Sequence, residues 1–283
     1  MGPLHQLEEH VRPRWWQWPT VLSMDAPAVS VAWLALLATR LEVELGWPDL
    51  FVLGASVWLA YAADRFIEGW RLASEHVRTP RHRFYQRWRG PVAVVWLAVL
   101  ITDLGVAAAK LTRTEWMVGW TLTAAVATYL LSHQFLHRTS RWRVPKEICV
   151  AGLLTGGAAV FLVGSTSLSV LVPSLTLFAA LCFVNCVLIS SWECDVDRSH
   201  QQSSLALDGG QTWWIHWAPW LLAAVGIVAA ASDPLRTIAA CTAASALLLA
   251  VIDHVQPRIG WPPARVLADL VLLTPIVPLA LLL

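Results

Sequence analysis

Long runs of apolar residues recur along almost the whole chain, and each is long enough to cross a lipid bilayer as an α-helix. A membrane-spanning helix needs about 20 mostly apolar residues. We expect such helices at residues 20–40, 47–68, 91–111, 116–136, 146–165, 170–192, 213–232, 235–253 and 264–282. The pattern predicts an all-α integral membrane protein, with nine transmembrane helices around a central cavity open to the cytoplasmic side.

The segment before the first apolar run has a different character. Residues 1–19 are polar and then rich in Trp, without the apolar core of a secretory signal peptide. We expect them to form a cytoplasmic N-terminal segment and residues 20–283 to form a single polytopic membrane domain. Pro275 and Pro278 interrupt the ninth run, which neighbouring helices can accommodate inside a membrane.

The composition agrees with a membrane protein. The chain is 57% hydrophobic and only 14% charged, and its mean hydropathy is +0.57; soluble domains rarely have this balance. Many of the 18 Trp residues lie near the ends of the predicted helices, as in the aromatic belts at membrane interfaces. The five Cys residues form no CxxC pair, so we expect them to be small buried side chains rather than disulfides.

The basic residues indicate the orientation of the chain. Cytoplasmic loops of membrane proteins carry an excess of Lys and Arg. With the N-terminus in the cytoplasm, only a few of the 20 basic residues fall on the other side: Arg40, Lys110, Arg113 and Arg236. We therefore expect a multi-pass protein of the cell membrane with its N-terminus and its chemistry on the cytoplasmic side.

Two acidic clusters follow predicted helices on that side. Asp64 and Glu68 are four residues apart, which places both carboxylates on one helix face about 6 Å apart along the axis. Glu193 and Asp197 repeat this spacing at the end of the sixth helix, with Asp195 between them. We expect the two clusters to face each other across the cavity.

The residues around these clusters suit one kind of ligand. Carboxylates bind hard cations such as Mg²⁺, which also takes water and phosphate oxygens as ligands. Arg78, Arg81 and Arg83 follow the first cluster, and guanidinium groups bind phosphate through two parallel hydrogen bonds. Carboxylates, a metal ion and arginines beside an apolar cavity together indicate a lipid with a diphosphate head group.

These features resemble the UbiA-type intramembrane prenyltransferase superfamily. Its members have nine transmembrane helices and two cytoplasmic acidic motifs, one after helix 2 and one after helix 6. The first motif typically reads Asn-Asp-x-x-Asp-x-x-x-Asp, and AYAADRFIE stands here in its place. Asp64 and Glu68 match its last two acids, whereas Ala60 and Tyr61 replace its Asn and first Asp. The segment ECDVD supplies the acids of the second motif.

The resemblance implies Mg²⁺-dependent transfer of a prenyl group from an isoprenyl diphosphate to a lipophilic or aromatic acceptor within the membrane. It implies catalytic roles for four acids: Asp64, Glu68, Glu193 and Asp197. These four would hold Mg²⁺, with Asp195 as a further ligand. The diphosphate would contact three basic residues: Arg78, Arg81 and Lys146. Asn185, about two helical turns deeper than Glu193, could reach the acceptor or the metal.

Other functions remain open at this stage. The chain could be a catalytically degenerate member that only binds lipid, a membrane terpene cyclase, or a non-enzymatic transporter. In each case we expect the lipid bilayer as a partner and no nucleic acid. Three further acids lie inside or near the ends of predicted helices, where ionisable groups are functional candidates, and none has an obvious partner in the sequence: Asp103, Asp253 and Asp269.

Overall fold

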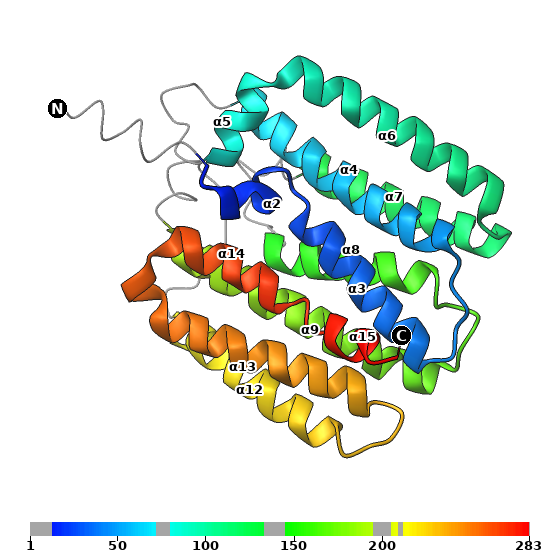
Figure 1. The fold of residues 1–283 in the computed structure, drawn as a ribbon, viewed down its shortest axis with the longest axis vertical. Coiled ribbons are helices and arrows are strands. Elements are labelled where there is room, and N and C mark those ends of the chain that lie inside the picture. Colours follow the sequence, from blue (N-terminus) through cyan, green and yellow to red (C-terminus); the bar gives the residue numbers. More distant parts are fainter. Residues whose placement is uncertain (1–12, 72–79, 133–144, 195–204, 209–211, 283) are drawn as a thin grey trace.

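The computed structural model describes residues 13–71, 80–132, 145–194, 205–208 and 212–282, and every regular element within them is a helix. The longer helices lie roughly along a common direction in Figure 1. They are α3 (Asp25–Arg40), α4 (Trp47–Arg71), α6 (Arg89–Lys110), α7 (Arg113–Leu131), α8 (Lys146–Val160), α9 (Leu168–Trp192), α12 (Trp213–Ala229), α13 (Arg236–Ile259) and α14 (Trp261–Val271). The shorter ones are η1 (Trp15–Gln17), α2 (Trp18–Val21), α5 (Pro80–Arg87), α11 (Leu205–Asp208) and α15 (Ile276–Ala280).

A helix overlaps each of the nine ranges expected from the apolar pattern. Among the described residues, four helices are long and apolar enough to cross a membrane: α4 as far as Ile67, α6, α9 and α13. A fifth span results if the bent pair Trp15–Val21 and Asp25–Arg40, which meet at 75°, is taken as one. The chain is therefore a multi-pass, all-helical membrane protein, while nine spans and a central cavity stay predictions.

Helix α9 occupies the centre of the bundle, where it contacts α8, α12, α13 and α14. Its side chains bury a large part of their surface, because apolar residues surround it on most sides. The indole of Trp33 on α3 stacks on Phe178 of α9, with ring centroids 5.0 Å apart. Both rings are fully buried, so this contact ties the first long helix to the central one.

The ninth predicted helix is broken, and its neighbours compensate for the break. Helix α14 ends at Val271 and α15 begins at Ile276, directly after Pro275. The backbone carbonyls freed at this point accept bonds from other helices: Ser245 Oγ donates to Val271 O at 2.8 Å, and Trp33 Nε1 donates to Leu272 O at 2.8 Å. Inside a membrane a freed carbonyl must find such a partner, since no water is present to hydrogen-bond it.

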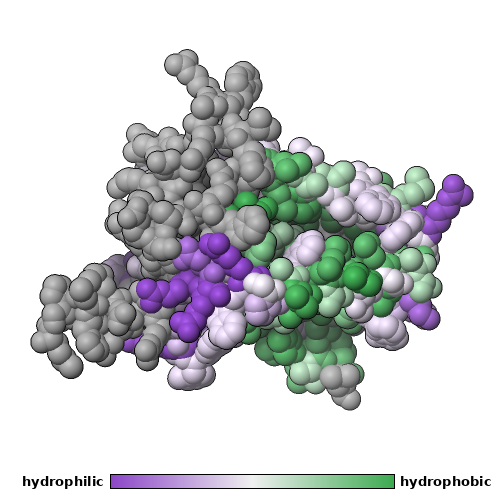
Figure 2. Space-filling view, turned by 90° about the horizontal axis from the view of Figure 1, so that it is seen from above, coloured by the Kyte–Doolittle hydropathy of each residue, from purple (hydrophilic) through white to green (hydrophobic). Residues whose placement is uncertain are grey.

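The periphery of the bundle is apolar. Helix α6 exposes a row of aliphatic side chains, among them Val94, which is 70% exposed, and Ile101. Figure 2 shows apolar residues over the middle of the visible face and hydrophilic residues near its two ends. Lipid chains are the medium in which such a surface is stable.

The short helices α2 and α5 pack together over one end of the bundle. The hydroxyl of Tyr85 on α5 donates to Ser23 Oγ at 3.2 Å, and Trp58 Nε1 on α4 donates to Leu22 O at 3.0 Å. Tyr85 is only 2% exposed. These contacts fix α5, and with it the arginine described next, at this end of the molecule.

Candidate functional site

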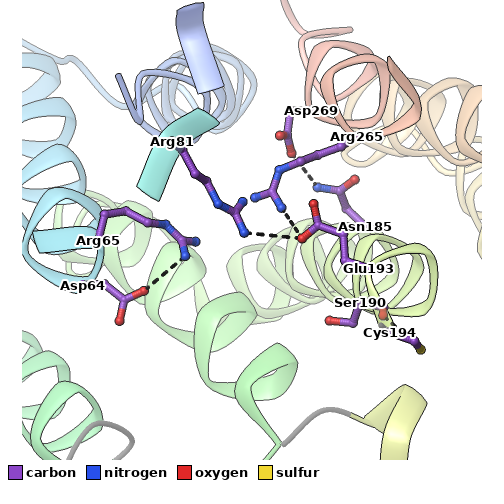
Figure 3. A network of polar contacts seen from close by, with 9 residues as sticks. All are labelled: Asp64, Arg65, Arg81, Asn185, Ser190, Glu193, Cys194, Arg265 and Asp269. Carbon is purple, nitrogen blue, oxygen red and sulfur yellow. Dashed lines mark hydrogen bonds and ion pairs between the residues drawn. The ribbon is translucent and has the colours of Figure 1, made fainter. Parts of the chain in front are cut away.

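Charged side chains from several helices meet at one end of the bundle (Figure 3). Helix α4 supplies two of them, α5 and α14 supply one each, and the last lies just beyond the end of α9. We call this group the polar site: Asp64, Arg65, Arg81, Glu193 and Arg265. These residues are far apart in sequence, so only the fold brings them together.

Glu193 is the most buried member of the polar site. It is the residue that caps the C-terminus of α9, where its backbone N–H donates to Ile189 O, and it is 4% exposed. Its Oε2 accepts a bond from Arg265 Nη1 at 2.6 Å and another from Arg81 Nη2 at 3.4 Å. Burial would raise the pKa of Glu193, but the two guanidinium groups outweigh it and hold the pKa at about 2. Glu193 is therefore ionised at neutral pH.

Arg265 is the functional candidate that the sequence interpretation missed. The distribution of basic residues places it on the cytoplasmic side and assigns it no further role, although its Nη1 lies 2.6 Å from Glu193 Oε2. Its side chain is 15% exposed. The available signal was an arginine four residues before Asp269, on the same face of an otherwise apolar helix.

Asp64 of the first acidic motif lies on the opposite side of the arginine side chains from Glu193. Asp64 Oδ2 is 3.9 Å from Arg65 Nη1, and Figure 3 places Asp64 and Glu193 on either side of the Arg65 and Arg81 guanidinium groups. Both side chains of the Asp64–Arg65 pair are mostly buried. The polar site thus holds three cations and two carboxylates.

The remaining predicted site residues are placed as follows. Asn185 is 6% exposed, and its Nδ2 donates to Asp269 Oδ1 at 3.1 Å. Lys146 is the first residue of α8 and is half-buried. The backbone of Glu68 belongs to α4, but its side chain lies outside the described part of the chain, as do Arg78, Asp195 and Asp197 altogether.

The three isolated acids all have partners that the sequence did not reveal. Asp253 Oδ1 accepts a bond from Trp192 Nε1 at 2.9 Å, and its Oδ2 is 2.7 Å from His216 Nδ1. Asp103 Oδ2 accepts a bond from Ser56 Oγ at 2.9 Å. Asp269 pairs with Asn185, as above. Each bond joins different helices, so these acids also fix the packing of the bundle.

No family model matches the sequence, and no curated protein matches it. Its fold, however, is that of a known structure, the apo structure of a UbiA homologue from Aeropyrum pernix K1. The two superpose with a TM-score of 0.57 at 16% sequence identity, and the similarity covers 91% of this chain and 98% of that one.

Proposed function

We propose that this protein, which has the fold of a UbiA homologue, is an intramembrane prenyltransferase. It would transfer a prenyl group from an isoprenyl diphosphate to a lipophilic or aromatic acceptor, with Mg²⁺ as cofactor and the polar site facing the cytoplasm. The observation that carries the proposal is the convergence of arginines from α4, α5 and α14 at one end of an apolar bundle of this fold. Such an end can hold a polyanionic head group while its lipid tail lies between the helices.

The arginines have the chemistry that a diphosphate requires. Guanidinium groups present a planar fork of donors that matches phosphate oxygens, and charge-assisted bonds of this kind are among the strongest in proteins. Arg81 and Arg265 already bind one anionic group, the carboxylate of Glu193. A diphosphate would share or replace that carboxylate, so we propose that both arginines bind the diphosphate, together with Arg78 and Lys146.

The carboxylates suit Mg²⁺ in their donor chemistry. Within the described residues, no three His, Cys, Asp or Glu side chains are grouped so as to hold a metal by themselves. Mg²⁺ does not need such a cage, because it takes a few carboxylates together with water and phosphate oxygens. Glu193 Oε1 is buried and has no hydrogen-bond partner in the described part of the chain, so one carboxylate oxygen remains for a cation. The residues that we propose would hold Mg²⁺ are Asp64, Glu68, Glu193, Asp195 and Asp197.

When bound, Mg²⁺ would neutralise charge on the diphosphate oxygens. The protein's own contribution is the placement of its guanidinium groups. As the bond between the prenyl carbon and the diphosphate oxygen breaks, negative charge grows on the diphosphate, and fixed donors stabilise it without reorganising. The apolar helices below the polar site exclude water from the prenyl cation, which would otherwise be captured as an alcohol.

Arginine variants test this assignment. We expect Arg265→Gln to lower the rate of diphosphate release from a prenyl diphosphate by about 10²-fold, the usual loss when one stabilising donor is removed. Arg236→Gln is the matched control, because Arg236 forms an exposed pair with Asp233 far from the polar site and should leave the rate unchanged. Equal rates for the two variants would show that Arg265 does not bind the diphosphate.

A further inference from the structure

The contact between Glu193 and its two arginines leaves part of the ion pair unmatched (Figure 3). Glu193 binds both guanidinium groups through one oxygen, because Oε2 accepts from Arg265 Nη1 at 2.6 Å and from Arg81 Nη2 at 3.4 Å. Its other oxygen, Oε1, is buried and has no hydrogen-bond partner in the described part of the chain. The same holds for Nε of Arg265. The pair of Glu193 and Arg265 thus keeps one unmatched acceptor and one unmatched donor.

This geometry differs from that of an ion pair that only links helices. An arginine and a carboxylate frequently pair through two parallel bonds, which use both carboxylate oxygens. A buried polar atom without a partner is costly and uncommon in proteins. Glu193 is only 4% exposed and the side chain of Arg265 only 15% exposed, so water has little access to either. Completing both atoms requires a cation or a donor at Glu193 Oε1 and an acceptor at Arg265 Nε.

A divalent cation together with a diphosphate supplies both missing partners at once. Mg²⁺ takes carboxylate and phosphate oxygens as ligands, which fits the free oxygen of Glu193. Phosphate oxygens accept bonds from guanidinium nitrogens, which fits Nε of Arg265. A metal ion alone leaves the donor unmatched, and a metal-free anion leaves the acceptor unmatched. The polar site is therefore better suited to the two ligands together than to either one.

The charge of Glu193 opposes a metal-free anion. An anion that approaches Arg81 and Arg265 without a metal meets the carboxylate that already binds both of them. Like charges brought together in a site of low polarity repel strongly. A cation on the second oxygen of Glu193 relieves this repulsion. The carboxylate thus competes with a bare diphosphate and tolerates a metal-bound one.

The two arginines oppose a metal ion that arrives alone. They already neutralise part of the charge of Glu193, and a cation at Oε1 would lie near the guanidinium groups that share Oε2. Arg81 is only 9% exposed, so its charge is weakly screened. A diphosphate beside the arginines removes this conflict. Each ligand therefore raises the affinity of the site for the other, and such coupling is reciprocal.

We propose that Glu193 is a specificity-determining residue that restricts the polar site to a diphosphate complexed with a divalent cation, and that it excludes the metal-free anion by competing for Arg81 and Arg265. The inference rests on the proposed function for the identity of the ligand. It gives Glu193 a role besides metal binding, because in the unliganded protein its carboxylate binds the groups that a phosphate would bind. A prenyl diphosphate without its metal is thereby kept from occupying the site.

Titration calorimetry of the full-length protein with inorganic diphosphate tests the exclusion. In the unmodified protein we expect binding with Mg²⁺, and binding at least about 10-fold weaker after a chelator removes the metal. Glu193→Gln keeps the shape and removes the charge, so metal-free diphosphate should bind about 10-fold more tightly than to the unmodified protein. Glu115→Gln is the matched control, because Glu115 bonds to Thr112 at the start of α7, and it should leave both affinities unchanged.

Arg81→Gln tests the competition from the other side, with Mg²⁺ alone as the probe. This variant retains the shorter contact, between Glu193 and Arg265, so it is less disruptive to the fold than Glu193→Gln. With one guanidinium group removed, Glu193 carries more uncompensated charge, and Mg²⁺ should bind several-fold more tightly than to the unmodified protein. An arginine that serves only to bind phosphate would leave the affinity for Mg²⁺ unchanged. If Glu193→Gln does not fold, this titration decides.

The outcomes separate this inference from the proposed function. The selective role of Glu193 is overturned if metal-free diphosphate binds Glu193→Gln no more tightly than the unmodified protein, or if Mg²⁺ binds Arg81→Gln no more tightly. Affinities that change as expected, in a protein that never cleaves a prenyl diphosphate, would uphold the role of Glu193 and overturn prenyl transfer. Failure of the unmodified protein to bind diphosphate, with or without Mg²⁺, would overturn both.

Discussion

At the scale of single residues, Glu193 shows how the protein keeps a buried charge ionised. A lone carboxylate at 4% exposure would be strongly destabilised, but guanidinium groups from two other helices contact one of its oxygens. The same contacts hold α5 and α14 against the end of α9. The charge is therefore at once a part of the candidate site and a link between helices.

A pH dependence of stability follows from this residue. The pKa of Glu193 falls from 4.5 in the unfolded chain to about 2 in the folded protein. A depressed pKa contributes stability that is fully present above pH 4.5 and is lost as the pH falls toward 2. We expect Glu193→Gln to melt at a lower temperature than the unmodified protein at neutral pH, because removing one partner of a buried ion pair costs about 3–5 kcal/mol.

The measurement is the melting temperature of the detergent-solubilised protein between pH 7 and pH 3. The gap between the unmodified protein and Glu193→Gln should narrow as the pH falls below 4.5. A gap that stays constant over this range would contradict the ion-pair assignment.

The sequence predicted part of the site at this scale. The spacing of the acids identified Glu193 as a candidate, and Arg81 was a candidate because it follows the first acidic cluster. It could not indicate that these two side chains bind each other, since that depends on which helices are neighbours and how their faces are turned. Arg265 escaped prediction for the same reason, as did the hydrogen bond between Asn185 and Asp269.

At the scale of helices, α12 and α13 pack closely against each other. A Cβ atom at Gly226 of α12 would lie 2.9 Å from the carbonyl oxygen of Ala239 and 2.9 Å from Cβ of Ala243 on α13. Helices in membranes commonly approach each other this closely at small residues, because packing and not water exclusion holds them together. The apolar pattern alone predicts both helices but gives no indication of this contact.

Substitution at this contact should destabilise the bundle. We expect Gly226→Leu to cost about 1–3 kcal/mol through overpacking and to lower the melting temperature. Gly119→Leu on α7 is the matched control, because a Cβ atom at Gly119 meets nothing within 4 Å. If both variants melted at the same temperature, α12 and α13 would not be packed as described.

The positions of the helices could be predicted more fully than their ends. Every apolar range contains helix, because backbone groups in a membrane must bond within their own segment. The break between α14 and α15 was indicated by Pro275. The sequence did not indicate that Ser245 and Trp33 donate hydrogen bonds to the backbone carbonyls freed at this break, since both donors lie on distant segments of the chain.

At the scale of the whole molecule, the fold separates an end rich in charged side chains from an apolar body. The arginines of the polar site gather where α2 and α5 cover the bundle, and the exposed faces of the outer helices are apolar. This division suits a lipid diphosphate, whose head and tail differ in the same way. Similarity of fold to a UbiA homologue agrees with it, although fold by itself does not determine function.

The most direct test of the central claim is the release of diphosphate from a prenyl diphosphate by the purified, unmodified protein, measured with Mg²⁺ and with Mg²⁺ removed by a chelator. We predict release in the presence of Mg²⁺ and its loss on chelation. Prenyl diphosphate that binds tightly but is never cleaved, with or without Mg²⁺, would contradict the account and favour a protein that binds lipid without catalysis.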